Sequence, residues 1–171
     1  MADKKKQTES LPILLVEDNA INQVVAKQIL AKSGFIVDIA SSGKEALARL
    51  SERIYALVLM DVQMPEMDGM KTKKKIREGK SSVLDPAVTV IAMTAYTSKE
   101  DQEQCIEAGM DDFISKPLEM DAFIKKVKEH YQINNPGGAE KEEVPILDEE
   151  DLRARLGDDR ELEREILADF L

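Results

Sequence analysis

The sequence predicts an α/β fold in which helices cover both faces of a parallel sheet. Short apolar runs with the length of strands alternate five times with longer stretches whose apolar residues recur at helical spacing. In such an alternation each helix connects two parallel strands, and the resulting sheet is buried on both faces. A chain of 171 residues has room for one domain of this class and a remainder.

Strands are expected where the chain is richest in Leu, Val, Ile and Met. Because parallel strands end at the same edge of a sheet, the residues that follow these runs should converge there. The five runs are residues 11–16, 35–39, 56–60, 88–93 and 112–114.

Helices are expected between these runs and after the last one. The first stops at Gly34, a natural C-cap residue, and shows at the spacing of one face Ile21, Val24, Val25 and Ile29. The second opens with a capping box, in which a serine is followed three residues later by a glutamate. The predicted positions are 42–45 for the start of the second, just after Gly69 for the third, Ser98 to Gly109 for the fourth, and about 119 to 131 for the fifth.

Composition is that of an ordinary globular protein from a reducing compartment. The hydrophobic content is 43%, and the single Cys105 excludes an internal disulfide and is expected to be structural. The first residues lack the apolar segment of a signal peptide, and no run approaches the ~18 apolar residues of a membrane span. We therefore expect a soluble, cytoplasmic chain without membrane contact.

The formal net charge of −10 is distributed unevenly. Residues 1–135 carry 21 acidic and 19 basic side chains, whereas residues 136–171 carry 13 acidic and five basic ones. So acidic a tail argues against binding to nucleic acid. A basic stretch in the third helix could contact an acidic partner or nucleic acid. It lacks interleaved aromatic residues for base stacking, so a solvated helix face is expected instead. It comprises Lys71, Lys73, Lys74, Lys75, Arg77 and Lys80.

Composition also divides the chain into parts. Residues 1–9 are expected to be an N-terminal tail and residues 10–132 the main domain. The polar stretch 133–145, which contains Pro-Gly-Gly, has the character of a linker. A helical pattern resumes over 146–171, but two short helices cannot enclose a core alone.

Five residues with charged or reactive side chains follow the predicted strands. Convergence of the strand ends would bring three carboxylates, a hydroxyl and an ammonium into one shallow site. These residues are Glu17 and Asp18 after the first strand, Asp61 after the third, Thr94 after the fourth and Lys116 after the fifth.

Three clustered carboxylates repel one another, which raises their pKa values unless a cation occupies the cluster. Mg²⁺ suits such a site because it prefers oxygen ligands and keeps several waters. The hydroxyl of Thr94 and the ammonium of Lys116 would then suit the oxygens of a phosphoryl group on Asp61. These residues indicate phosphoryl transfer to an aspartate.

Four motifs, in order and at matching spacing, carry a resemblance to a known family. They are Leu-Leu-Val-Glu-Asp-Asn at 14–19, Met-Asp-Val-Gln-Met-Pro-Glu-Met-Asp-Gly at 60–69, Met-Thr-Ala at 93–95 and Lys-Pro at 116–117. Together they resemble the receiver domain of two-component response regulators, especially receivers attached to hybrid histidine kinases. The resemblance covers residues 10–132 and implies a doubly wound, flavodoxin-like sheet of five strands in the order 2-1-3-4-5.

The resemblance implies that Asp61 accepts a phosphoryl group from a phosphohistidine on a histidine kinase or histidine phosphotransfer protein. Thr94 and Lys116 would contact the phosphoryl oxygens. The chain would then assist its own phosphorylation and dephosphorylation and would not turn over a small substrate. The implied ligands of Mg²⁺ are Glu17, Asp18, Asp61 and the backbone carbonyl of Gln63.

Further positions are implied to carry a switch. Movement of Thr94 is linked in the family to an aromatic residue at the position of Phe113, which here has no phenolic hydroxyl. Gln63 and Tyr96 stand where family members tune hydrolysis of the acyl phosphate. The implied readout face is the fourth helix, fifth strand and fifth helix, and Lys116–Pro117 resembles the family's cis peptide.

Residues 146–171 resemble the opening of a histidine phosphotransfer domain, a four-helix bundle whose reactive histidine lies on a later helix. This is consistent with a fragment of a larger phosphorelay or histidine kinase polypeptide. The apolar face of the segment is expected to dock on the receiver, pair with a second copy in a homodimer, or stay loosely ordered. His130 has no phosphohistidine motif around it and is expected to be structural, at a helix end that favours a cation.

Three other functions compete with this one. An aspartate-nucleophile phosphatase would carry a second acid two residues after Asp61, where Gln63 stands. A flavin or nucleotide binder would need a Ser-, Thr- or Gly-rich loop after the first strand, where Glu17 and Asp18 would repel a phosphate. An inert pseudo-receiver is disfavoured because the acid, hydroxyl and lysine set is intact.

Overall fold

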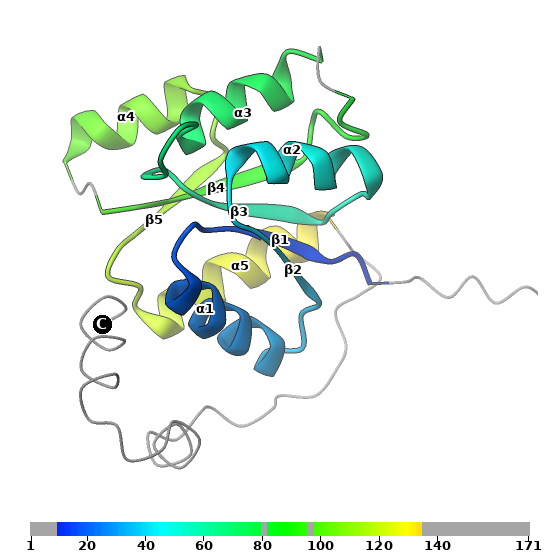
Figure 1. Cartoon of the computed structure of the whole chain (residues 1–171). Coiled ribbons are helices and arrows are strands. Elements are labelled where there is room, and N and C mark those ends of the chain that lie inside the picture. Colours follow the sequence, from blue (N-terminus) through cyan, green and yellow to red (C-terminus); the bar gives the residue numbers. More distant parts are fainter. Residues whose placement is uncertain (1–9, 80–81, 96–97, 135–171) are drawn as a thin grey trace, which may run out of the picture.

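The computed structural model describes residues 10–79, 82–95 and 98–134, which form a single sheet with helices on both sides (Figure 1). Its strand order is β2-β1-β3-β4-β5, and every adjacent pair is parallel. This confirms the predicted doubly wound fold and strand order. The elements are β1 (Ile13–Val16), α1 (Ala20–Lys32), β2 (Val37–Ala40), α2 (Gly43–Glu52), β3 (Leu57–Asp61), α3 (Gly69–Arg77), β4 (Thr89–Thr94), α4 (Lys99–Glu107), β5 (Asp112–Ser115) and α5 (Met120–Asn134).

The helices form two layers. Figure 1 shows α1 and α5 on one face of the sheet and α2, α3 and α4 on the other. Alternate residues of each strand fill two separate apolar clusters, one beneath each layer. In β1, Ile13 and Leu15 pack with α1 and α5, whereas Leu14 and Val16 pack with the other layer. Burial on both faces explains why β1 and the first four residues of β3 are continuously apolar.

Polar side chains fix where the first four helices begin. The side-chain oxygen of each N-cap residue accepts hydrogen bonds from backbone N–H groups of the first turn. In α2 the predicted capping box differs from the usual form, in which the glutamate accepts from the backbone N–H of the N-cap residue. Here the carboxylate of Glu45 accepts at 2.8 Å from the backbone N–H of Ser41, one residue before the N-cap. The N-caps are Asn19, Ser42, Asp68 and Ser98.

Some element ends differ from the sequence prediction. Asp61 and Thr94 are the last residues of β3 and β4, not the first residues after them. Helix α5 continues beyond 131 to Asn134, whose side-chain amide donates to the hydroxyl of Thr89 at 2.9 Å. This bond joins the end of α5 to the start of β4. The predicted segments 1–9 and 146–171 lie outside the described residues.

The composition predicts a structural cysteine and the absence of a membrane-spanning helix. Cys105 on α4 is buried, and burial raises the pKa of its thiol, which fits a structural residue. Within the described ranges, the helices are all too short or too polar to cross a membrane.

One position of the basic stretch contradicts the predicted solvated face. The side chain of Lys73 is fully buried, whereas Lys71, Lys74 and Lys75 are exposed. The buried ammonium donates to Oδ2 of Asp111 at 3.1 Å, so the charge is paired inside the fold.

Helical periodicity explains this burial. Lys73 belongs to the stripe of α3 that faces the sheet, which also contains Gly69, Thr72 and Ile76. Oδ2 of Asp111 further accepts from Arg77 at 3.0 Å and from the backbone N–H of Val90 at 2.7 Å. Asp111 therefore joins α3, β4 and the turn before β5.

Burial lowers the pKa of Lys73 from 10.5 to about 8, although Asp111 opposes the shift. Between these values the unfolded chain holds a proton that the folded protein has released. The free energy of unfolding should therefore rise by a few kcal/mol as pH increases through this window. Urea unfolding at a series of pH values measures the rise. Lys73→Met should abolish it and Lys74→Met should retain it, so an equal rise in both variants would contradict the assignment.

Candidate functional site

Strand register brings the predicted site residues to one edge of the sheet. In the pairing of β1 with β3, the residue before Glu17 lies beside the residue before Asp61. In the pairing of β4 with β5, Thr94 lies beside the residue before Lys116. Adjacent parallel strands thus end together, and the predicted convergence is confirmed.

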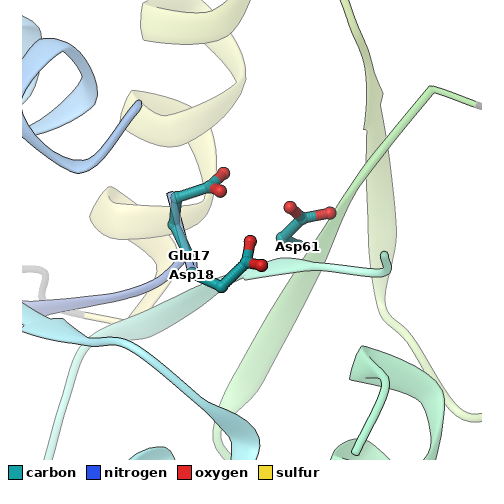
Figure 2. A group of neighbouring side chains, drawn as sticks. All are labelled: Glu17, Asp18 and Asp61. Carbon is teal, nitrogen blue, oxygen red and sulfur yellow. The ribbon is translucent and has the colours of Figure 1, made fainter. Parts of the chain in front are cut away.

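Three carboxylates face one another at this edge, as Figure 2 shows for Glu17, Asp18 and Asp61. Each offers one oxygen, and these oxygens lie within 4.8 Å of one another. Glu17 and Asp61 are buried, whereas Asp18 is exposed, so one side of the cluster is open to solvent. An all-oxygen set of this kind is compatible with a hard divalent cation.

Lys116 places its ammonium between the two buried carboxylates. Its Nζ donates to Oε2 of Glu17 at 3.1 Å and to Oδ2 of Asp61 at 3.2 Å. The side chain of Lys116 is 18% exposed, and those of Glu17 and Asp61 are 3% and 6% exposed. Salt screens the attraction between such buried groups only weakly. The ammonium therefore compensates the negative charge of two carboxylates that solvent reaches poorly.

Burial and neighbouring charges shift the pKa values of this group. Burial raises the pKa of Glu17 and Asp61 adds to the effect, while Lys116 opposes it. Burial alone would lower the pKa of Lys116, but attraction to Asp61 and Glu17 outweighs burial and raises it. Lys116 therefore remains charged at neutral pH, and the carboxylates still favour additional positive charge.

Backbone groups orient the two buried carboxylates. Oδ1 of Asp61 accepts from the backbone N–H of Gln63 at 2.9 Å, and Oε1 of Glu17 accepts from that of Asn19 at 3.1 Å. Asn19 had no predicted role, although an asparagine before an amphipathic run is a helix-start signal. Gly69 permits close approach of the chain, since a Cβ there would lie 2.6 Å from the carbonyl oxygen of Asp61.

Thr94 lies at the same edge and is fully buried. Its carbonyl oxygen accepts from the backbone N–H of Lys116 at 2.7 Å, which holds the ends of β4 and β5 together. The Lys116–Pro117 peptide is cis, as the resemblance implied.

Comparison with known protein families matches residues 13–128 to the response regulator receiver domain. The chain belongs to this family. The match spans more than half of the chain and includes all five strands and the residues at their ends.

Curated relatives of this receiver include large signalling proteins. Hybrid signal transduction histidine kinase L of Dictyostelium discoideum is 42% identical over 125 residues, which cover 71% of this chain and 7% of that protein. Histidine kinase 5 of Arabidopsis thaliana is 40% identical over 136 residues, which cover 66% of this chain and 15% of that protein. The chain therefore spans a small part of these relatives.

Solved receiver structures are also similar. One is the receiver domain of a Pseudomonas aeruginosa sensor histidine kinase with a magnesium ion in its active site cleft. It is 31% identical, with a TM-score of 0.63 and coverage of 71% of this chain and 98% of that chain. Another is a Saccharomyces cerevisiae receiver domain crystallised with a histidine phosphotransfer protein. It is 30% identical, with a TM-score of 0.66 and coverage of 74% and 92%.

The receiver has a second polar cluster where β5 meets α5. Asp112 contacts Lys126 at 2.9 Å and Nε2 of His130 at 2.8 Å. Burial opposes the ionised form, but hydrogen bonds from His130 and Lys126 lower the pKa of Asp112. His130 thus has the structural role expected from the sequence. It contacts a carboxylate and does not lie at the end of the helix, because α5 continues to Asn134. Residues 18 positions apart on different elements leave no local sequence signal of such a pair.

Phe113 is connected to this second cluster. Its carbonyl accepts from Nζ of Lys126 at 2.7 Å, and the same ammonium lies 5.1 Å from the centre of its ring. Lys126 was not singled out from the sequence. Tyr96 lies outside the described residues, so its predicted role stays a prediction.

Lys116→Met removes the positive charge between two buried acids. We expect the free energy of unfolding to fall by about 3 kcal/mol without divalent cations, because Glu17 and Asp61 would remain buried and uncompensated. Saturating Mg²⁺ should recover part of the loss. Urea unfolding with a chelator and with Mg²⁺ tests both effects, with the exposed Lys125→Met as control. Equal stability of the two variants in chelator would contradict the expectation.

Proposed function

We propose that the receiver takes up a phosphoryl group on Asp61 from a phosphohistidine of a partner protein. The supporting observation is the position of Asp61, which lies in a three-carboxylate cluster and accepts a hydrogen bond from Lys116. Membership of the receiver family and similarity to hybrid histidine kinases favour a histidine donor.

In the proposed transfer, a carboxylate oxygen of Asp61 attacks the phosphorus of the phosphohistidine. A P–O bond forms, the P–N bond breaks, and the leaving imidazole nitrogen takes a proton from solvent. The products are an acyl phosphate on Asp61 and a neutral histidine on the partner. The chain is thus an acceptor whose neighbouring groups assist phosphorylation and later hydrolysis.

Mg²⁺ fits the cluster by donor chemistry. Three carboxylates against the single ammonium of Lys116 leave net negative charge, and the exposed Asp18 leaves room for the waters that Mg²⁺ retains. When bound, the ion would offset charge between Asp61 and the phosphoryl oxygens. The magnesium in one similar receiver supports this choice of metal. The proposed ligands are Glu17, Asp18, Asp61 and the backbone carbonyl of Gln63.

Lys116 and Thr94 are proposed to bind the phosphoryl oxygens. A phosphoryl group adds about −1.5 to −2 charges at neutral pH, which would compete with Glu17 for the ammonium of Lys116. Because the carbonyl of Thr94 accepts from the N–H of Lys116, movement of one strand end would affect the other. Phe113 on β5 and the surface formed by α4, β5 and α5 would transmit the change.

The partner is proposed to be a histidine kinase or histidine phosphotransfer protein. One similar receiver was crystallised with a histidine phosphotransfer protein, which supports this class. We further propose that residues 10–132 are the receiver, 133–145 a linker whose first two residues still belong to α5, and 146–171 the start of a phosphotransfer domain. Gln63 and Tyr96 are proposed to tune hydrolysis of the acyl phosphate.

Acetyl phosphate with Mg²⁺ should phosphorylate the native chain at Asp61, because a small phosphodonor supplies the group without a partner. Beryllofluoride should bind at the same carboxylate. Intact-protein mass spectrometry detects the phosphoryl adduct, and fluorine NMR detects the bound fluoride. Asp61→Asn should abolish both signals, while Asp121→Asn on α5 should keep them. Equal labelling of native protein and Asp61→Asn would rule out the assigned acceptor.

Asp18→Asn should weaken Mg²⁺ binding by roughly tenfold or more, about 1.4 kcal/mol, because one of three anionic ligands is lost. Asp18 is exposed, so its replacement should leave the fold intact. Titration followed by NMR measures the dissociation constant, again with Asp121→Asn as control. An unchanged affinity would exclude Asp18 from the metal site.

A further inference from the structure

The sequence of α3 is strongly basic for its length. Its nine residues contain five basic side chains and no acidic one. Two of these bases, Lys73 and Arg77, are paired with Asp111. The other three lie on the exposed side of the helix, which we call the basic face of α3: Lys71, Lys74 and Lys75.

The basic face of α3 carries like charges three and four residues apart. Such neighbours lie on the same side of a helix and repel one another. Lys71 has an acidic neighbour in Asp68, but their charged atoms are 3.7 Å apart and the lysine side chain is 71% exposed. An acidic ligand on this face would relieve the repulsion.

The chain itself supplies the opposite charge shortly after α5. Residues 140–151 contain seven acidic side chains and one basic side chain, including four consecutive acids at 148–151. Residues 152–171 contain six acidic and four basic side chains, so the charge is more nearly balanced there. The strongest complement to the basic face of α3 is therefore residues 140–151.

The ends of α5 and α3 both contact residues at or just before the start of β4. Asn134 donates to the hydroxyl of Thr89, and Arg77 donates to the carbonyl of Pro86. Pro86 and Thr89 are three residues apart, a distance of at most about 11 Å along the chain. The chain therefore leaves α5 at the end of the sheet where α3 also ends, although the two helices lie on opposite faces.

The tether is long enough to place the acids on the basic face of α3. Asp148 follows Asn134 by fourteen positions, and an extended chain of that length spans up to about 50 Å. Helix α3 is only about 13 Å long. A short tether also keeps the local concentration of the acids near the millimolar range, which favours a weak electrostatic contact.

We propose that residues 140–151 bind the basic face of α3 within the same chain. The contact is electrostatic and competes with any external acidic partner of this helix. It does not depend on phosphorylation of Asp61, and its test uses no phosphodonor. Failure of this proposal therefore leaves the proposed acceptor function unaffected.

A spin label next to the acidic run tests the contact in the full chain. The label is attached through Ala154→Cys in a Cys105→Ala background, and NMR records the amide signals of the receiver. Signals of α3 should lose intensity, whereas those of α1 on the opposite face should not. The loss should disappear at about 1 M salt, where the Debye length falls to about 3 Å. Loss that is equal on both faces, or that persists in salt, overturns the proposal.

Matched charge variants of the labelled chain identify the acids and bases. Neutralising the four acids 148–151 to their amides should restore the α3 signals. The control neutralises four later acids, Asp158, Asp159, Glu161 and Glu163, and should keep the loss. Restoration by both sets to the same extent overturns the proposal.

On the receiver side, neutralising the basic face of α3 to glutamine should also restore the signals. The control is the same change at three exposed lysines of α1 and α5, namely Lys27, Lys125 and Lys128. A mixture of spin-labelled, unenriched chains with isotope-enriched, unlabelled chains shows contacts between copies. Loss of α3 intensity in that mixture means that the acids reach a second copy, which overturns binding within one chain.

Discussion

The candidate site depends on the contact of the Lys116 ammonium with two buried carboxylates. Glu17 and Asp61 are both buried at neighbouring strand ends, and two such carboxylates repel strongly in a medium that screens poorly. Lys116 lies between them and donates to both. Their attraction keeps its pKa raised despite burial, so the compensating charge is itself held in place.

The ammonium compensates only part of the negative charge of the cluster, and the uncompensated charge has a chemical consequence. One ammonium faces three carboxylates, and the third, Asp18, is open to solvent. The folded edge therefore attracts a cation without being destabilised by a full set of unpaired charges. The proposed roles of Mg²⁺ and a phosphoryl group both exploit this balance, because one adds positive charge and the other adds negative charge at the same place.

The fold and the location of the site could be predicted from sequence because both follow from local pattern and topology. Alternating apolar runs define the parallel sheet, and a parallel sheet forces the residues after Val16, Met60 and Met93 to one edge. The burial of Lys73 could not be predicted in this way, since its neighbours on α3 are also lysines. Its position on the core-facing stripe mattered more than its charge, and Asp111 lies 38 residues away in sequence.

Asp111 lies in the turn before β5, and Asp112 is the first residue of that strand. Asp111 binds Lys73 and Arg77 of α3, in the layer on one face of the sheet. Asp112 binds Lys126 and His130 of α5, in the layer on the other face.

These two adjacent acids therefore hold the start of β5 to both helix layers. The other end of the same strand leads into Lys116, which contacts the two buried carboxylates. A phosphoryl group beside Lys116 would therefore act on a strand whose start is held to the helices on both faces of the sheet. The residues between these two points include Phe113, whose carbonyl and ring both contact Lys126 of α5. The proposed switch would therefore act through the strand itself, between the paired acids and the lysine.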